Sequence, residues 1–269
     1  MKARRWMAVI TIAALFSAPF SFAADDKIGI FETIRAANVS FDEATTALDT
    51  ALATSGLVLH AKHDVRVPGA MHKARVYVMT SPTYADVARD ESPNTISAQI
   101  LRVAVYTSGE DQATFVNMAN PVAHAMVFYA KSPNYDKLVA AAGAAAEEIR
   151  QLASAVPGAA MSGQQAPIRT EKHYNKYKGD GPARMMAKFR TFQKSQLVIK
   201  EDSAENFDKV VADVQAALTN SDVSSADEST GWEQVAVIRL RDDAVYIGVT
   251  NPYICLLYTS DAADDRYKV

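Results

Sequence analysis

The sequence predicts an α+β fold of two tandem related modules, each an antiparallel sheet with helices packed on one face. Three features that occur twice in the same order support this prediction: an amphipathic helix, a β-hairpin and an Asn-Pro dipeptide. The composition is that of a globular protein, because 49% of the 269 residues are hydrophobic and 22% are charged. A chain of this length can bury one large core or two smaller ones.

Residues 1–23 have the pattern of a secretory signal peptide. Basic residues precede an apolar run from Trp6 to Phe16, and Ser21-Phe22-Ala23 offers a small-residue cleavage site. A membrane anchor is the alternative, but the run is shorter than the roughly 20 residues that a spanning helix needs. We therefore expect a periplasmic or secreted protein that has no stable membrane span once the signal is cleaved.

The first module is predicted to occupy residues 24–156, with a helix that begins at Phe41. Apolar residues recur at helical spacing after this position, and Ser40 with Glu43 forms a capping box. The same spacing follows Phe207, where Asn206 takes the cap position. The two patterns match in register, which indicates a repeat; two unrelated amphipathic helices are the alternative.

The second repeated feature is a β-hairpin. Strand patterns at 103–105 and 115–116 are split by a polar turn and end at Asn120-Pro121. Their counterparts at 235–237 and 246–247 end at Asn251-Pro252. Only the first module has further elements, which are strand patterns at 57–67 and 74–79, a short helix at 84–89, an apolar stretch at 122–129 and an alanine-rich helix at 135–156. The second module, residues 193–254, is therefore abbreviated.

Residues 157–192 are predicted to form a linker, because their first part is rich in Gly, Ala, Ser and Gln. The strip 169–194 is basic and contains aromatic residues, although the whole chain carries a net charge of -3. This strip could bind an anionic ligand, an acidic partner or the acidic surface of a second copy in a homodimer, while a solvated linker is the alternative. The acidic chain argues against general nucleic-acid binding.

The tail 255–269 has a sequence unlike the rest of the chain. Residues 255–265 resemble the translation of a sequencing adapter, and a natural strand with an acidic tail is the alternative. We therefore expect the second module to be truncated near Ile254. Cys255 is the only cysteine, so the remainder offers no disulfide, thiolate nucleophile or thiolate metal ligand.

Part of the first module is similar to a known bacterial family. The residues on which this similarity rests are Phe41-Asp42-Glu43-Ala44, Ser81-Pro82-Thr83-Tyr84, the strand from Leu101 to Tyr106, Gly109 and Asn120-Pro121. Over about residues 40–125 they resemble the family called domain of unknown function 302, with the second module as a shorter copy. The resemblance implies a compact α+β fold, often exported or membrane-associated, and it implies no activity.

The sequence contains few residues in patterns that are typical of catalysis or metal binding. His60, His63 and His72 lie near one another, but positions i and i+3 of a strand point to opposite faces, so we predict no metal site and no cofactor. The ligand-binding residues we select are Asn120, Arg102, His124 and Asn251. Each asparagine precedes a proline at a strand end, where capping the next turn is the alternative role. Arg102 is a basic residue at the start of a strand, where it could bind an anion or act as an edge charge.

These features favour a non-catalytic exported protein that binds a small molecule or a partner. Two alternatives stay open. One is a hydrolase or redox enzyme whose site would bring His60 or His124 together with a carboxylate in a cleft. The other is a structural envelope component with a large apolar surface patch.

Overall fold

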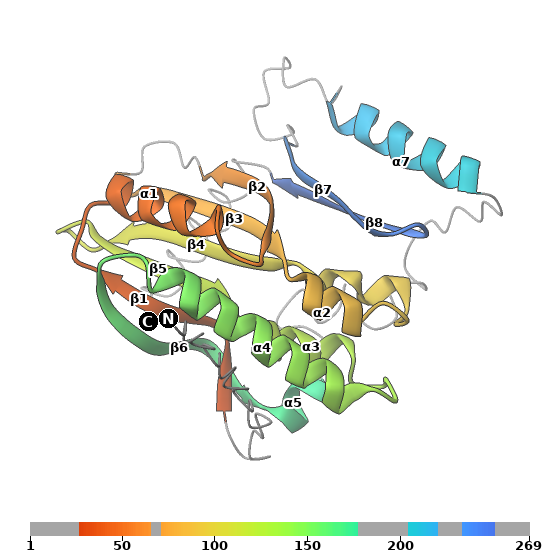
Figure 1. Cartoon of the computed structure of the whole chain (residues 1–269), viewed down its shortest axis with the longest axis horizontal. Coiled ribbons are helices and arrows are strands. Elements are labelled where there is room, and N and C mark those ends of the chain that lie inside the picture. The colour runs from red at the N-terminus through yellow and green to blue at the C-terminus, as the bar shows by residue number, and fades with distance from the viewer. Residues whose placement is uncertain (1–26, 66–70, 177–203, 220–232, 251–269) are drawn as a thin grey trace, which may run out of the picture.

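The computed structural model describes residues 27–65, 71–176, 204–219 and 233–250 (Figure 1). It contains an antiparallel sheet with helices, so the α+β prediction is confirmed. The signal pattern, most of the basic strip, Asn251 and the tail 255–269 lie outside the described residues.

The main sheet has six strands in the order β2-β3-β4-β5-β1-β6, and each strand runs antiparallel to its neighbours. The hairpin predicted at 103–116 is confirmed as β4 and β5, and Gly109 takes a φ of +78° in its turn. The strands are β1 (Lys27–Ala37), β2 (Val58–Asp64), β3 (Ala74–Thr80), β4 (Leu101–Ser108), β5 (Ala113–Ala119) and β6 (Gly158–Thr170).

Two long helices cover one face of this sheet. Figure 1 shows α1 (Phe41–Leu52) and α4 (Tyr135–Ala153) lying across it. Their apolar stripes pack on Val103, Val105 and Val116 to form the main core. Shorter helical segments connect the strands or lie at the end of the sheet: α2 (Pro82–Val87), the 3-10 helix η1 (Pro93–Gln99), α3 (Pro121–Phe128) and α5 (Glu171–Asn175).

The predicted start of α1 is confirmed in detail. The Glu43 backbone N–H donates to Ser40 Oγ over 3.3 Å, and the Ser40 backbone N–H donates to Glu43 Oε2 over 3.0 Å. These two bonds satisfy donors that the first turn of a helix leaves without a partner. The Ser40 hydroxyl also donates to Glu43 Oε2 over 2.7 Å, and this bond, followed by the bond from the Ser40 backbone N–H, lowers the pKa of Glu43.

The predicted linker was wrong over residues 158–175, because these residues form β6 and α5. β6 pairs with β1 along its whole length, and β1 itself was not predicted. Gly, Ala, Ser and Gln have low intrinsic strand propensity, so β6 depends on the neighbouring strand for its conformation. The first module therefore extends past residue 156.

The predicted second hairpin is present as β7 (Glu233–Arg241) and β8 (Ala244–Thr250), and α7 (Ala204–Thr219) precedes it. Ala236 and Ile238 pack against Val78 and Ile100 on the face of the main sheet opposite the helices. A two-stranded sheet is marginally stable alone, so this contact supports the hairpin. The repeat relation stays a prediction, because the described part of the second module has only these three elements.

One contact occurs in both parts of the chain. Lys73 Nζ lies 5.5 Å from the centre of the Phe41 ring and forms an ion pair with Asp42. The Arg239 guanidinium lies 5.4 Å from the centre of the Phe207 ring and forms an ion pair with Asp208. A cation therefore lies over the Phe-Asp pair of both helices, and it comes from Lys73, just before β3, in one part and from Arg239, on β7, in the other.

Gly158 is required where β6 begins beside β1. Its φ is +145°, and a β-carbon there would lie 2.1 Å from the Ala36 carbonyl oxygen. We expect Gly158→Ala to lower the free energy of unfolding by about 1 to 2 kcal/mol, because it adds a backbone clash to a strained φ. Urea unfolding measures this loss. Gly56→Ala is the control, since nothing lies within 4 Å of its β-carbon position, and an equal loss there would contradict the explanation.

Candidate functional site

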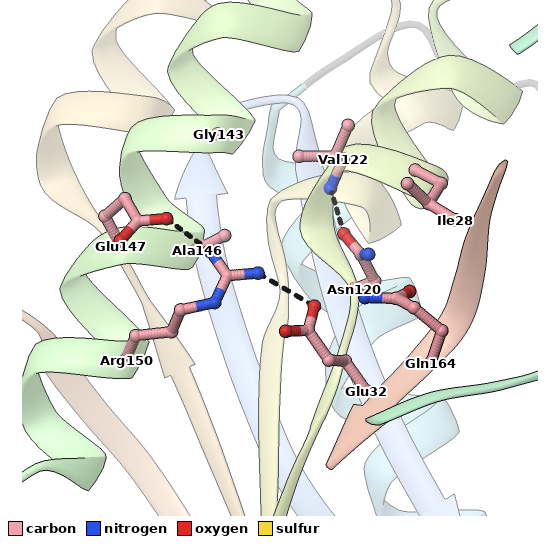
Figure 2. A pocket seen from close by; sticks show the side chains of 9 residues that line it. All are labelled: Ile28, Glu32, Asn120, Val122, Gly143, Ala146, Glu147, Arg150 and Gln164. Carbon is pink, nitrogen blue, oxygen red and sulfur yellow. Dashed lines mark hydrogen bonds and ion pairs between the residues drawn. The ribbon is translucent and has the colours of Figure 1, made fainter. Parts of the chain in front are cut away.

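A small pocket lies between the sheet and the helices α3 and α4 (Figure 2). Its volume is about 60 Å³, which is more than one ordered water molecule needs. The lining residues come from β1, β6, α4 and the β5–α3 junction, and they are Ile28, Glu32, Asn120, Val122, Gly143, Ala146, Glu147, Arg150 and Gln164.

A buried ion pair forms one wall of the pocket. Glu32 is 1% exposed on the helix-covered face of β1, and its Oε2 accepts a bond from Arg150 Nη2 over 2.8 Å. Arg150 also forms an ion pair with Glu147, one turn earlier on α4. The Arg150 and Glu147 side chains are 34% and 47% exposed, so they lie at the solvent side of the pocket. Burial lowers the pKa of Arg150, but its bonds to the two carboxylates outweigh this and raise it.

Two side-chain amides form another part of the lining, and the oxygen of each accepts a hydrogen bond from a backbone N–H. Asn120 Oδ1 accepts from the Val122 N–H over 3.0 Å, which caps α3. Gln164 Oε1 accepts from the Gly29 N–H over 2.6 Å. Gln164 lies directly across from Glu32 in the β1–β6 register, so the two side chains share a face. The amide –NH2 groups are left as donors, since no described residue accepts from them.

Gly143 keeps space open at the helix wall of the pocket. It is buried in the middle of α4, yet a β-carbon added there would meet nothing within 4 Å outside the helix's own backbone. Glycine inside a helix is about 1 kcal/mol less favourable than alanine. The helix therefore has a glycine where an alanine would fit without a clash and would favour folding.

The structure describes three of the four predicted ligand-binding residues. Asn120 lines the pocket, and it also takes the capping role that was the alternative for it. Arg102 and His124 do not line it; they contact each other, with 3.4 Å between Arg102 Nη2 and His124 Nδ1. Asn251 lies outside the described residues.

The contact between Arg102 and His124 fixes the state of the imidazole. Burial, with a smaller contribution from the positive charge of Arg102, lowers the pKa of His124 to about 3. The ring is therefore neutral at pH 7, and Nδ1 must be the unprotonated acceptor because arginine can only donate. The proton then resides on Nε2, and His124 does not act as an acid near neutral pH.

Glu32, Gln164, Gly143 and Arg150 were not predicted as site residues from the sequence. A usable signal for Glu32 was present, since Ile28, Ile30, Glu32 and Ile34 alternate along one strand face and place an acid among isoleucines. A buried carboxylate in such a pattern requires a partner. No local pattern indicates that the partner is Arg150, because 118 positions separate the two residues.

The described residues show neither a metal cluster nor a membrane span. No three His, Cys, Asp or Glu side chains among them group in a way that could hold a metal ion. His60 instead lies beside Thr80, with 2.9 Å between Nε2 and Oγ1, and burial lowers the pKa of its ring. No helix in the described part of the chain is long and apolar enough to cross a bilayer.

Comparison of the chain with protein-family models, with curated proteins and with solved structures found no match.

Proposed function

We propose that the protein is an exported, non-catalytic binding module that holds a small polar molecule in the pocket between β1, β6, α3 and α4. The observation on which the proposal rests is Gly143, which leaves room in the pocket that the buried Glu32 also lines, at a cost in helix stability. A cavity that serves only packing would gain stability from an alanine there. Export rests on the signal pattern of residues 1–23, and the resemblance to domain of unknown function 302 stays a prediction.

The lining of the pocket favours binding over catalysis. A hydrolase or redox enzyme would bring His60 or His124 together with a carboxylate in a cleft. Neither histidine lines this pocket. Its two carboxylates, Glu32 and Glu147, both pair with Arg150. With a volume of about 60 Å³, the pocket suits a ligand of a few heavy atoms rather than an organic cofactor, which needs several hundred Å³.

The proposal predicts opposite effects of one substitution on stability and on binding. We expect Gly143→Ala to raise the free energy of unfolding by about 1 kcal/mol, because the helix gains alanine without a clash. The added methyl group should at the same time weaken ligand binding, because it occupies the pocket. Urea unfolding and a chemical-shift titration measure the two effects on the same sample.

The titration uses four probes of similar size on the full chain: acetate, methylammonium, acetamide and ethylene glycol. At least one of them should shift backbone resonances at Glu32, Gly143 and Gln164 in a saturable way, and Gly143→Ala should weaken that probe. Gly56→Ala is the control for an added methyl group far from the pocket. If none of the four probes shifts these resonances, the pocket is not a binding site and the proposal is wrong.

A further inference from the structure

The charges around the pocket disfavour a charged ligand. An anion that approached Arg150 would also lie beside Glu32, which is buried and negatively charged. A cation that approached Glu32 would meet the Arg150 guanidinium, which already donates to that carboxylate over 2.8 Å. An unpaired charge beside the buried Glu32 is costly, so a neutral molecule fits best.

The hydrogen-bonding groups that remain define the shape of this neutral molecule. Asn120 and Gln164 each have their side-chain oxygen bonded to a backbone N–H, so their –NH2 groups are the parts that have no bond and can donate to the ligand. Glu32 has Oε2 bonded to Arg150, so Oε1 remains as an acceptor. Figure 2 shows these three side chains directed into one space. A ligand that accepts from the two amides and donates to Glu32 matches these groups, while Glu147, the second carboxylate of the lining, is 47% exposed and pairs with Arg150 at the solvent side.

We infer that the pocket binds a small neutral amide, with the carbonyl oxygen toward Asn120 and Gln164 and the N–H toward Glu32; this inference rests on the proposed binding function. A carbonyl oxygen has two lone pairs and accepts both amide donors at once, while its N–H lies on a neighbouring atom. An alcohol has donor and acceptor on the same oxygen and matches this separation less well. Ile28, Val122 and Ala146 supply apolar contacts for the carbon end of the amide.

The test compares the four probes on the full chain by chemical-shift titration. Acetamide is expected to bind in the millimolar range, as suits a ligand of four heavy atoms, and to shift the side-chain –NH2 resonances of Asn120 and Gln164. Acetate, methylammonium and ethylene glycol are expected to bind about tenfold more weakly, because the first two carry a charge and the hydroxyl oxygens of ethylene glycol are both donor and acceptor.

Two near-isosteric variants remove the donors and leave the backbone bonds in place. Asn120→Asp keeps an oxygen for the Val122 N–H, and Gln164→Glu keeps one for the Gly29 N–H. Each should weaken acetamide binding about tenfold through one lost donor and added negative charge. Gln165→Glu is the matched control, because the Gln165 side chain donates to Thr33 Oγ1 on the opposite face of the sheet. The affinity of this variant for acetamide should stay within about twofold of that of the unmodified chain.

The outcomes separate the two proposals. The amide inference is supported if the unmodified chain and Gln165→Glu prefer acetamide over the other probes and if Asn120→Asp and Gln164→Glu lose this preference. Saturable binding at the pocket with preference for acetate, methylammonium or ethylene glycol overturns the amide inference and leaves the proposed function in place. No binding of any probe to the unmodified chain overturns both, and this result does not depend on whether the variants fold.

Discussion

Arg150→Met is expected to lower the free energy of unfolding by about 3 kcal/mol, because it leaves the Glu32 carboxylate buried without its charge partner. The Glu32 side chain is 2% exposed, whereas Arg150 is 34% exposed, so only the glutamate would be left without water around it. Methionine keeps the length and apolar contacts of the arginine stem, which confines the change to the charge. Urea unfolding at pH 7 measures the loss.

Two further variants test the explanation. Arg89→Met breaks an exposed ion pair with Asp86, whose side chains are 70% and 67% exposed, and should cost less than about 1 kcal/mol. The double variant Glu32→Gln with Arg150→Met removes both charges and should recover most of the lost stability. A double variant no more stable than Arg150→Met alone would show that the loss comes from packing and not from the unpaired carboxylate.

The elements that the sequence predicted correctly are those with strong local signals. The capping box at Ser40 and Glu43 identifies the start of α1, and the polar turn around Gly109 identifies the β4–β5 hairpin. Both signals act within a few residues, so no knowledge of the rest of the chain is needed. Local signals were less accurate for the helix predicted at 84–89, which is α2 at Pro82–Val87.

The pocket could not be predicted in the same way, because it depends on contacts between distant residues. β6 pairs with β1 across more than a hundred positions, and that pairing sets Gln164 opposite Glu32. Propensity favours a linker for a Gly-, Ala- and Gln-rich stretch, and the neighbouring strand overrides it. Asn120 was selected from its position before a proline, which also accounts for its cap, and only the fold places its side chain in the pocket.

His124 is expected to make the protein less stable as the pH falls. Burial, with a smaller contribution from Arg102, holds the pKa of the folded-state imidazole at about 3, below its ordinary value of 6.5. The unfolded chain therefore binds a proton below pH 6.5 that the folded chain does not bind. The contribution of His124 to the free energy of unfolding is constant above pH 6.5. It falls as the pH drops from 6.5 toward 3. Between pH 7 and pH 5 the loss due to His124 is about 2 kcal/mol.

Urea unfolding at pH 7 and pH 5 measures this loss, and His124→Asn isolates it. Asparagine places its Oδ1 near the position of Nδ1, so it can still accept from Arg102, but it does not titrate. This variant should lose about 2 kcal/mol less than the unmodified chain between the two pH values. His72→Asn, at an exposed position, should leave the pH dependence unchanged. Equal pH dependence in His124→Asn and the unmodified chain would mean that His124 is protonated in the folded state, where it would have to lie beside Arg102 as a second positive charge.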